Sequence, residues 1–171
     1  MEAEEEPTPS EKATGGGAVK QLNLSSFQCN YLILSCSSQK KEHPTERAID
    51  LYEGQAFRMV RQFMKENPGI SIHVDVLSAK YGLIDALEEI EDDPWEPYDL
   101  LMDPARAAAW RSVIDECIEK KYYLEGNTFF YGSELYYSAL PFDVPHSHGP
   151  IGMQLHQLKE FLGSLKQEVL K

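Results

Sequence analysis

The sequence predicts an α/β fold, a three-layer α/β/α sandwich with a central, mainly parallel, four-stranded sheet. Short apolar segments rich in β-formers alternate along the chain with longer segments whose apolar residues recur at helical spacing, and this alternation is typical of parallel sheets with helical crossovers. Residues 30–34 are apolar on both faces, as expected of a central strand covered by helices. A chain of 171 residues with 42% hydrophobic content fits one such domain.

Each element follows from its local pattern. Residues 1–17, with clustered Glu, two prolines and a Gly run, predict a disordered acidic tail, which leaves residues 18–171 as a single α/β domain. Strands are expected over residues 30–34, 70–77, 128–131 and, as the fourth, 142–144, and helices over 45–66, 104–117, 135–140 and 151–170. The first helix has a potential break at Gly54. Residues 85–103 are acidic and interrupted by prolines, so we expect a long irregular excursion.

Charge and composition narrow the class of protein. The tail carries −4 and residues 85–99 carry −8, which together account for the net charge of −12. The neutral remainder disfavours a non-specific DNA binder but leaves room for a local basic groove. The apolar runs are of strand length and the N-terminus lacks a signal pattern, so we expect a cytoplasmic protein that does not contact membranes. Three cysteines, without a C-x-x-C pair, indicate reduced thiols, and we expect no metal or cofactor.

Polar residues gather after each expected strand. In open parallel sheets, ligands bind beyond the carboxyl ends of the strands, so these residues predict one site. They are Ser35, Cys36, Ser37, Lys40 and Lys41 after the first strand, Ser78, Lys80 and Tyr81 after the second, Ser133, Glu134 and Tyr136 after the third, and His146 and His148 after the fourth. We expect Lys40, Lys80, Tyr136 and His148 to meet in a single pocket.

Several of these residues have more than one interpretation. Serines beside lysines can cradle a phosphate, but they also cap turns. Cys36 is either a nucleophilic thiolate favoured by nearby lysines or a small buried side chain. The two histidines can contact substrate or be ordinary loop residues, and a metal site is the weakest option because no third ligand is spaced to join them. Residues 95–99 place two aromatic rings and two carboxylates where they can stack a base and supply a general base, or simply pin the loop to the core.

Four motifs together suggest a family. They are Leu-Ser-Cys-Ser-x-x-Lys at residues 34–40, Leu-Tyr-x-Gly-x-x-Phe at 51–57, Leu-Ser-Ala-Lys-Tyr-Gly-Leu at 77–83 and Glu-Pro-Tyr-Asp at 96–99. Over roughly residues 30–162 the chain resembles an uncharacterised prokaryotic and phage family that looks distantly related to the uracil-DNA glycosylase superfamily and to the archaeosine synthase core. In those glycosylases one loop after the first strand is catalytic, a second after the third strand forms a base pocket, and a His-containing loop precedes the last helix. Residues 35–40, 132–136 and 146–150 occupy these places.

The resemblance implies a DNA glycosylase that flips out and excises a modified base, such as a hypermodified phage base, in antiviral defence or repair. It implies that modified DNA is the partner, that His148 or His146 contacts the leaving base, and that Tyr81, Tyr98 or Tyr136 stacks it. The first loop lacks the carboxylate that the superfamily often places there, so the water-activating group is expected, in order, from Asp99, Glu96, Asp85 or Glu134.

Two alternatives remain open. Cys36 and Lys40 match the Cys and Lys of the archaeosine synthase motif, which implies a transferase acting on a deazaguanine or nucleotide-like substrate. The Pro-Tyr that follows in that motif, and its later Ser and His, are missing here. The absence of a complete catalytic set also leaves a non-catalytic nucleotide-binding module possible.

Overall fold

The computed structural model describes residues 29–42, 45–91 and 100–168. The predicted tail therefore lies outside the described residues, as do residues 92–99 of the acidic segment. The strands are β1 (Asn30–Ser35), β2 (Thr45–Arg47), β3 (His73–Ser78), β4 (Gly82–Asp85), β5 (Glu89–Glu91) and β6 (Asn127–Tyr131). The helices are α1 (Ala48–Leu51), α2 (Gln55–Glu66), α3 (Pro104–Cys117), α4 (Lys121–Glu125), α5 (Glu134–Tyr137) and α6 (Ile151–Glu168).

The main sheet has four strands in the order β4-β3-β1-β6. β1 pairs in parallel with both β3 and β6, whereas β4 pairs antiparallel with β3. Leu32, Ile33 and Leu34 of β1 have no exposed surface, because helices cover this central strand on both faces. The predicted α/β class and the mainly parallel four-stranded sheet are thus confirmed, with one antiparallel edge strand.

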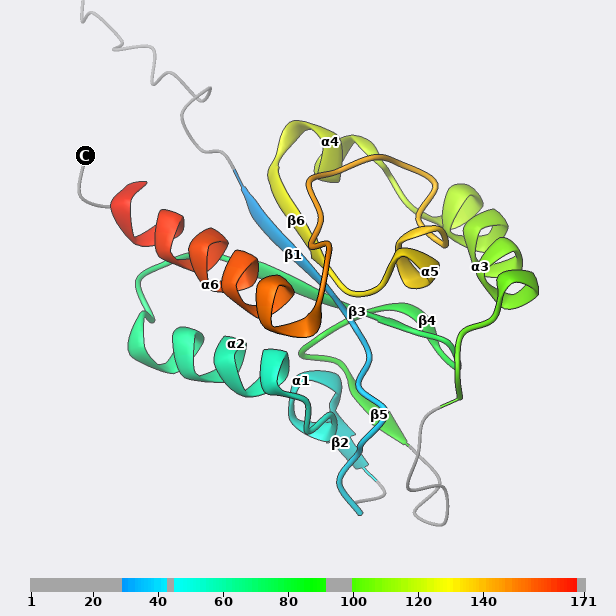
Figure 1. The fold of residues 1–171 in the computed structure, drawn as a ribbon, viewed down its shortest axis with the longest axis horizontal. Helices are drawn as coiled ribbons and strands as arrows, with labels where there is room; N and C mark the ends of the chain where they lie inside the picture. Colours follow the sequence, from blue (N-terminus) through cyan, green and yellow to red (C-terminus); the bar gives the residue numbers. More distant parts are fainter. Residues whose placement is uncertain (1–28, 43–44, 92–99, 169–171) are drawn as a thin grey trace, which may run out of the picture.

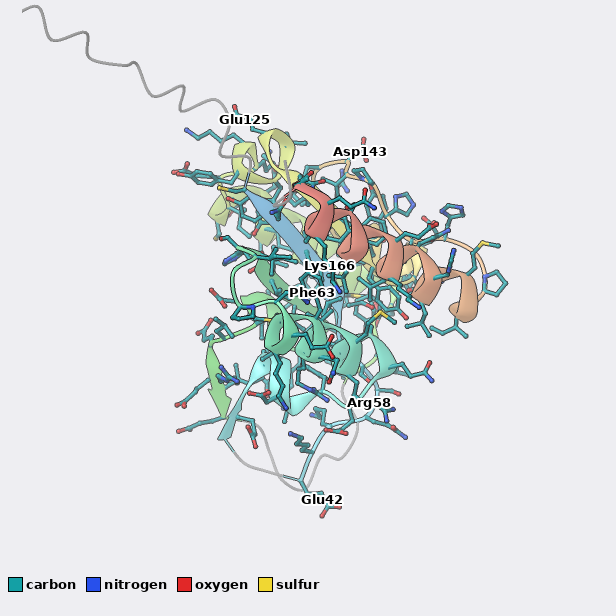
Figure 2. The ribbon with its side chains drawn as sticks, turned by 90° about the vertical axis from the view of Figure 1, so that its left-hand side faces the viewer. Glu42, Arg58, Phe63, Glu125, Asp143 and Lys166 are labelled. Atoms are coloured by element: carbon teal, nitrogen blue, oxygen red, sulfur yellow. The ribbon has the colours of Figure 1, made fainter. Side chains whose placement is uncertain are left out.

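Alternate residues of the strands face two separate apolar clusters. On one face, Leu32 and Leu34 pack with residues of α1, α2 and α6, and α2 and α6 lie side by side (Figure 1). On the other face, Ile33 packs with residues of α3, α4 and the α5 region. Figure 2 shows Phe63 of α2 beside Lys166 of α6, whose Nζ lies 5.7 Å from the ring centroid. The period-2 alternation of β1 therefore supplies both halves of the core.

The predicted fourth strand at residues 142–144 is wrong; the fourth strand of the sheet is β4, which pairs with β3 at the edge opposite to β6. The backbone of Val144 is bonded by the Tyr137 hydroxyl, which donates to its carbonyl at 3.0 Å and accepts from its N–H at 3.1 Å. The chain reaches the edge of β6 just afterwards: Phe130 N–H donates to Pro145 O, and Ser147 N–H donates to Phe130 O, both at 2.9 Å. A tyrosine side chain thus replaces a strand partner for residue 144, which sequence periodicity does not show.

Two other expectations also need correction. The predicted helix over residues 45–66 is divided into β2, α1 and α2, and it breaks immediately before Gly54, the N-cap of α2. β2 is a strand because β5 pairs antiparallel with it. The predicted irregular excursion from residue 85 is partly regular, because a turn in which Glu88 N–H donates to Asp85 O at 3.0 Å leads into β5. Among the described residues, no helix combines the length and apolar character needed to cross a membrane.

Candidate functional site

The carboxyl ends of β1, β3 and β6 meet at one edge of the sheet, because the three strands run parallel and in register. A pocket of about 250 Å³ opens at this edge. Its wall comes from the end of β1, the start of α2, the end of β6 and the first residue of α6. The lining residues are Ser35, Cys36, Ser37, Gly54, Gln55, Ala56, Phe57, Tyr131 and Ile151. The amino-terminal ends of α2 and α6 therefore both border the pocket, and the first N–H groups of a helix, which have no acceptor within the helix, favour negative charge nearby.

The loop after β1 folds back onto the connection between α1 and α2. Cys36 N–H donates to Leu77 O at 2.9 Å and so prolongs the pairing with β3. Farther along, Glu53 N–H donates to Gln39 O at 3.0 Å. The backbones of Lys40 and Tyr52 form an isolated antiparallel β-bridge. Lys40 is only 7% exposed and is not among the residues that line the pocket. The backbone of this loop is thus held on two sides, which orients Ser35, Cys36 and Ser37 toward the pocket.

Two glycines allow the pocket walls to approach one another. A Cβ on Gly132 would lie 2.6 Å from Ser35 Oγ, a distance that real Cβ atoms do not show. A Cβ on Gly54 would lie 3.0 Å from Ser37 Oγ. The missing side chains therefore let the loop after β6 and the start of α2 contact the loop after β1. Gly54 belongs to the 51–57 motif, and its role here is close packing.

The loop after β6 is joined to the loops on either side of it. Ser147, which is 1% exposed, accepts a hydrogen bond from Gly132 N–H at 3.0 Å and donates to Gly132 O at 3.2 Å. Ser133 caps α5 by accepting from Tyr136 N–H. The Tyr136 hydroxyl in turn lies 3.3 Å from Cys36 Sγ. Residues from three loops, after β1, after β6 and before α6, are therefore in contact at this edge.

The two histidines differ in their surroundings. The His146 ring stacks on Tyr137 with centroids 3.9 Å apart, and its Nε2 lies 3.2 Å from Glu134 Oε1. His146 is thus oriented by an aromatic ring and a carboxylate. His148 is exposed, and its backbone N–H donates to Gln157 Oε1 at 2.9 Å, so its loop is fastened to α6.

The residues after β3 form a separate turn. Ser78 is fully buried and accepts hydrogen bonds from the N–H groups of Lys80 and Tyr81 at 3.1 and 3.2 Å. Its role is that of a turn cap. Lys80 Nζ lies 5.3 Å from the Tyr81 ring centroid, and the Tyr81 hydroxyl donates to Glu91 O at 3.5 Å. Neither Lys80 nor Tyr81 lines the 250 Å³ pocket.

The structure thus brings together part of the predicted site. Ser35, Cys36 and Ser37 line the pocket, Tyr136 contacts Cys36, and Glu134 contacts His146. Lys40, Lys80, Tyr136 and His148 do not gather in this pocket as expected, because none of them lines it. Glu96, Tyr98 and Asp99 lie outside the described residues. Among the residues that are described, no group of three or more His, Cys, Asp or Glu is arranged to hold a metal ion.

Sequence reasoning missed several pocket residues. Gln55, Phe57, Tyr131 and Ile151 line the pocket but were interpreted only as parts of helices or strands. A usable signal was present for two of them, since Gln55 and Ile151 each open a helix that follows a strand end or a glycine-containing loop. Such positions face the carboxyl edge of a parallel sheet.

Comparison with known families gives one result. Residues 31–160 match the Family of unknown function (DUF6884). The chain belongs to this family. The match spans β1 to α6 and therefore includes every described element of the pocket. No curated protein and no solved structure matches the chain.

Proposed function

We propose that this member of the DUF6884 family is a DNA glycosylase that excises a modified nucleobase and leaves an abasic site. The observation that supports it is the contact among the loops after β1, after β6 and before α6. Cys36 Sγ lies 3.3 Å from Tyr136 OH, and Gly132 is doubly bonded to Ser147. By their order along the chain, these three loops resemble the functional loops of the uracil-DNA glycosylase superfamily. The proposal includes a three-layer α/β/α sandwich like that of these glycosylases.

The pocket suits a single base. Its volume of about 250 Å³ is below the ~300–1,000 Å³ of pockets that hold drug-sized ligands. Phe57 and Tyr131 supply aromatic surface, while Ser35, Ser37 and the amide of Gln55 supply donors and acceptors for a base edge. A base flipped out of a duplex would enter this pocket while its sugar and phosphates stay outside.

The electrostatics of the pocket compensate for the acidic composition of the chain. Helices α2, of 12 residues, and α6, of 18 residues, both have their amino-terminal ends at the pocket. Their positive ends stabilise a DNA phosphate near the opening, and they also stabilise the negative charge that develops on a departing base. The net charge of −12 is thus compatible with DNA binding at this edge.

The proposed reaction is hydrolysis of the bond between the sugar and the base. A water molecule adds to the sugar C1′ atom, the C1′–N bond breaks, and its electron pair leaves with the base. In the proposal a carboxylate accepts the proton from water, with Asp99 first and Glu96 second, and His146 or His148 donates a proton to the departing base. Asp85 is disfavoured as the general base because of its place in the sheet. It lies opposite Asp75 in the β3–β4 ladder, three residues away from the carboxyl end of β3, where the pocket opens. Glu134, which contacts His146 Nε2, acts as a positioning residue for that histidine.

We propose that the Ile151 side chain fills the space that the flipped nucleotide leaves in the DNA base stack. Ile151 is 66% exposed although it lines the pocket. Exposure of a large apolar side chain to water is unfavourable, and contact with DNA bases would remove this surface from water. Proteins that extrude or kink DNA insert such side chains between base pairs. Ile151→Ala is therefore expected to slow release from duplex DNA more than release from single-stranded DNA, in which no stack has to be filled.

The proposal is tested by incubating the purified protein with unmodified DNA and with hypermodified phage DNA, followed by alkaline cleavage at abasic sites. We expect strand breaks only with a modified genome. Asp99→Asn or Glu96→Gln is expected to reduce the rate by about 10²–10⁴-fold, the usual contribution of a general base. Absence of abasic sites on every modified genome would contradict the proposal.

The role of Glu134 is tested by a double-mutant cycle with His146. Glu134→Gln and His146→Gln are each expected to slow base release, and the double variant is expected to be no slower than the worse single variant, because both changes disable the same group. Glu125→Gln is the matched control, since Glu125 is also an exposed helical carboxylate but precedes the amino end of β6, whereas Glu134 follows its carboxyl end. Additive effects of the two single changes would refute the assignment.

A transferase that uses Cys36 is the second candidate, on a specific observation: Cys36 lines the pocket, and its Sγ is 3.3 Å from the Tyr136 hydroxyl. In such a transfer the Cys36 thiolate would bond to the group being transferred as that group's bond to its leaving group breaks, and an acceptor nucleophile would then displace the thiolate. Cys36→Ser separates the two functions, because it should abolish a thiol-dependent transfer and leave a glycosylase largely active. Cys29, Cys36 and Cys117 are not joined by disulfides, and a reducing, cytoplasmic location is part of either proposal.

A further inference from the structure

A second pocket, of about 330 Å³, lies at the amino ends of β1 and β3. The carboxyl edge that carries the candidate site is at the other end of these strands. The wall of this second pocket includes Tyr31, His73, Tyr122, Tyr123 and Glu119. The two pockets have no lining residue in common. The second pocket is therefore independent of the proposed active site.

Aromatic rings form much of its wall. The Tyr31 ring lies 5.2 Å from that of Tyr123 at an interplanar angle of 54°, and 5.6 Å from that of His73 at 68°. Stacking of Tyr123 on Phe142, with centroids 5.0 Å apart, fixes the position of this wall. Tyr122 is 52% exposed, and Lys121 Nζ lies 5.5 Å from its ring centroid. One ring in the wall is thus already in contact with an ammonium group of the protein itself.

Negative charge lies behind these rings. Asp75 is 4% exposed, and its two carboxylate oxygens are 3.0 Å from His73 Nε2 and 2.8 Å from the Tyr123 hydroxyl. The hydrogen bond to Asp75 raises the pKa of His73, and the charges of Asp75 and Asp85 act in the same direction. Burial raises the pKa of Tyr123 most, and the same two charges raise it further. The charges of Asp75 and Asp85 thus act on both groups as a negative potential does.

We propose that this pocket binds an organic ammonium group. The faces of tyrosine rings attract cations, and Glu119 in the wall and Asp75 behind it add negative charge. An anionic ligand would face the Glu119 carboxylate, from which a neutral ligand would gain nothing, whereas Asp75 is buried behind the wall and bonded to His73 and Tyr123. The chemical class is therefore a small amine or quaternary ammonium compound, which the rings contact through its alkyl groups as well as its charge.

The proposal is tested with the full-length protein by two-dimensional ¹H–¹⁵N NMR titration. The probes are choline, spermidine and the neutral choline analogue 3,3-dimethyl-1-butanol, at constant ionic strength maintained with sodium chloride. We expect choline, spermidine or both to shift the amide signals of Tyr31, His73, Tyr122 and Tyr123, and the neutral analogue to bind at least about fivefold more weakly. The more tightly bound probe distinguishes a quaternary ammonium site from a polyamine site.

Variants of Tyr122 provide the matched control, because this exposed residue can be changed without affecting the core. Tyr122→Phe keeps the ring and should retain binding, whereas Tyr122→Leu should weaken it by about five- to thirtyfold. Three results would overturn the proposal: equal binding of the neutral analogue, no loss of binding in Tyr122→Leu, or amide shifts spread evenly over the whole protein. None of these results depends on glycosylase activity.

Discussion

Replacement of Gly132 by alanine tests whether close approach of two loops builds the candidate site. The added Cβ would lie 2.6 Å from Ser35 Oγ, 2.7 Å from Ser35 Cβ and 2.8 Å from Phe130 Cζ. Because Gly132 is buried and bonded to Ser147 through both backbone polar groups, the loop cannot move away without breaking hydrogen bonds. Overpacking of a core usually costs about 1–3 kcal/mol, and a weakened hydrogen bond adds about 0.5–1.5 kcal/mol. We therefore expect Gly132→Ala to lower the free energy of unfolding by about 2–4 kcal/mol.

The assay is urea denaturation followed by circular dichroism, with Gly163→Ala as the matched control. Gly163 lies within α6 and has no neighbouring atom within 4 Å of an added Cβ, so alanine there should stabilise the protein by about 0.4–1 kcal/mol. Ser35→Gly removes two of the three clashing atoms, and in combination with Gly132→Ala it should recover part of the loss, which a double-mutant cycle measures. The reasoning is refuted if Gly132→Ala unfolds at the same urea concentration as the natural protein.

Three further predictions follow from contacts outside that loop. Tyr123→Phe deprives the buried Asp75 of a hydrogen-bond donor at 2.8 Å and should cost about 1–3 kcal/mol in urea denaturation; an unchanged midpoint would show that this bond does not stabilise the fold. Asp103→Ala removes the α3 cap, whose side chain accepts from Arg106 N–H at 2.7 Å, and should cost about 1 kcal/mol, measured in the same way. The pKa of His73 is raised in the folded protein, chiefly by its hydrogen bond to Asp75. The protonated His73 side chain therefore stabilises the fold fully below the pKa that it has in the unfolded chain, and this stabilisation is lost as the pH rises through its pKa in the folded protein. The natural protein should therefore exceed His73→Asn in stability by more at pH 5.5 than at pH 9, and a constant difference would contradict the shift.

The elements that could be predicted from the sequence are those whose signal is local. The apolar run of β1 indicated a central strand, and Leu32 to Leu34 are indeed fully buried. Pro104 marked the start of α3, and Asn67, the C-cap of α2, follows the last helical residue as predicted. β4 was missed because its strand character depends on pairing with β3, and the short segment 82–85 carries no strong periodicity of its own.

The candidate site was predictable only in outline. The polar residues at strand ends were recognisable because parallel strands place their carboxyl ends together, and Ser35, Cys36 and Ser37 do line a pocket. The residues of the second strand end do not line this pocket; Ser78 caps its own turn by accepting from the N–H groups of Lys80 and Tyr81. A hydroxyl group in a loop can bond its own backbone or a ligand, and the sequence does not distinguish these two uses.

The amino-acid sequence by itself determined the alternation of apolar strands and amphipathic helices, and thereby the α/β class and the edge of the sheet at which ligands can bind. Only the tertiary structure decided which loops touch. The contacts between Cys36 and Tyr136, and between Gly132 and Ser147, join residues that are 100 and 15 positions apart. Such contacts depend on where a glycine leaves room and on which polar group lies nearest, and these distances arise only once the layers are packed together.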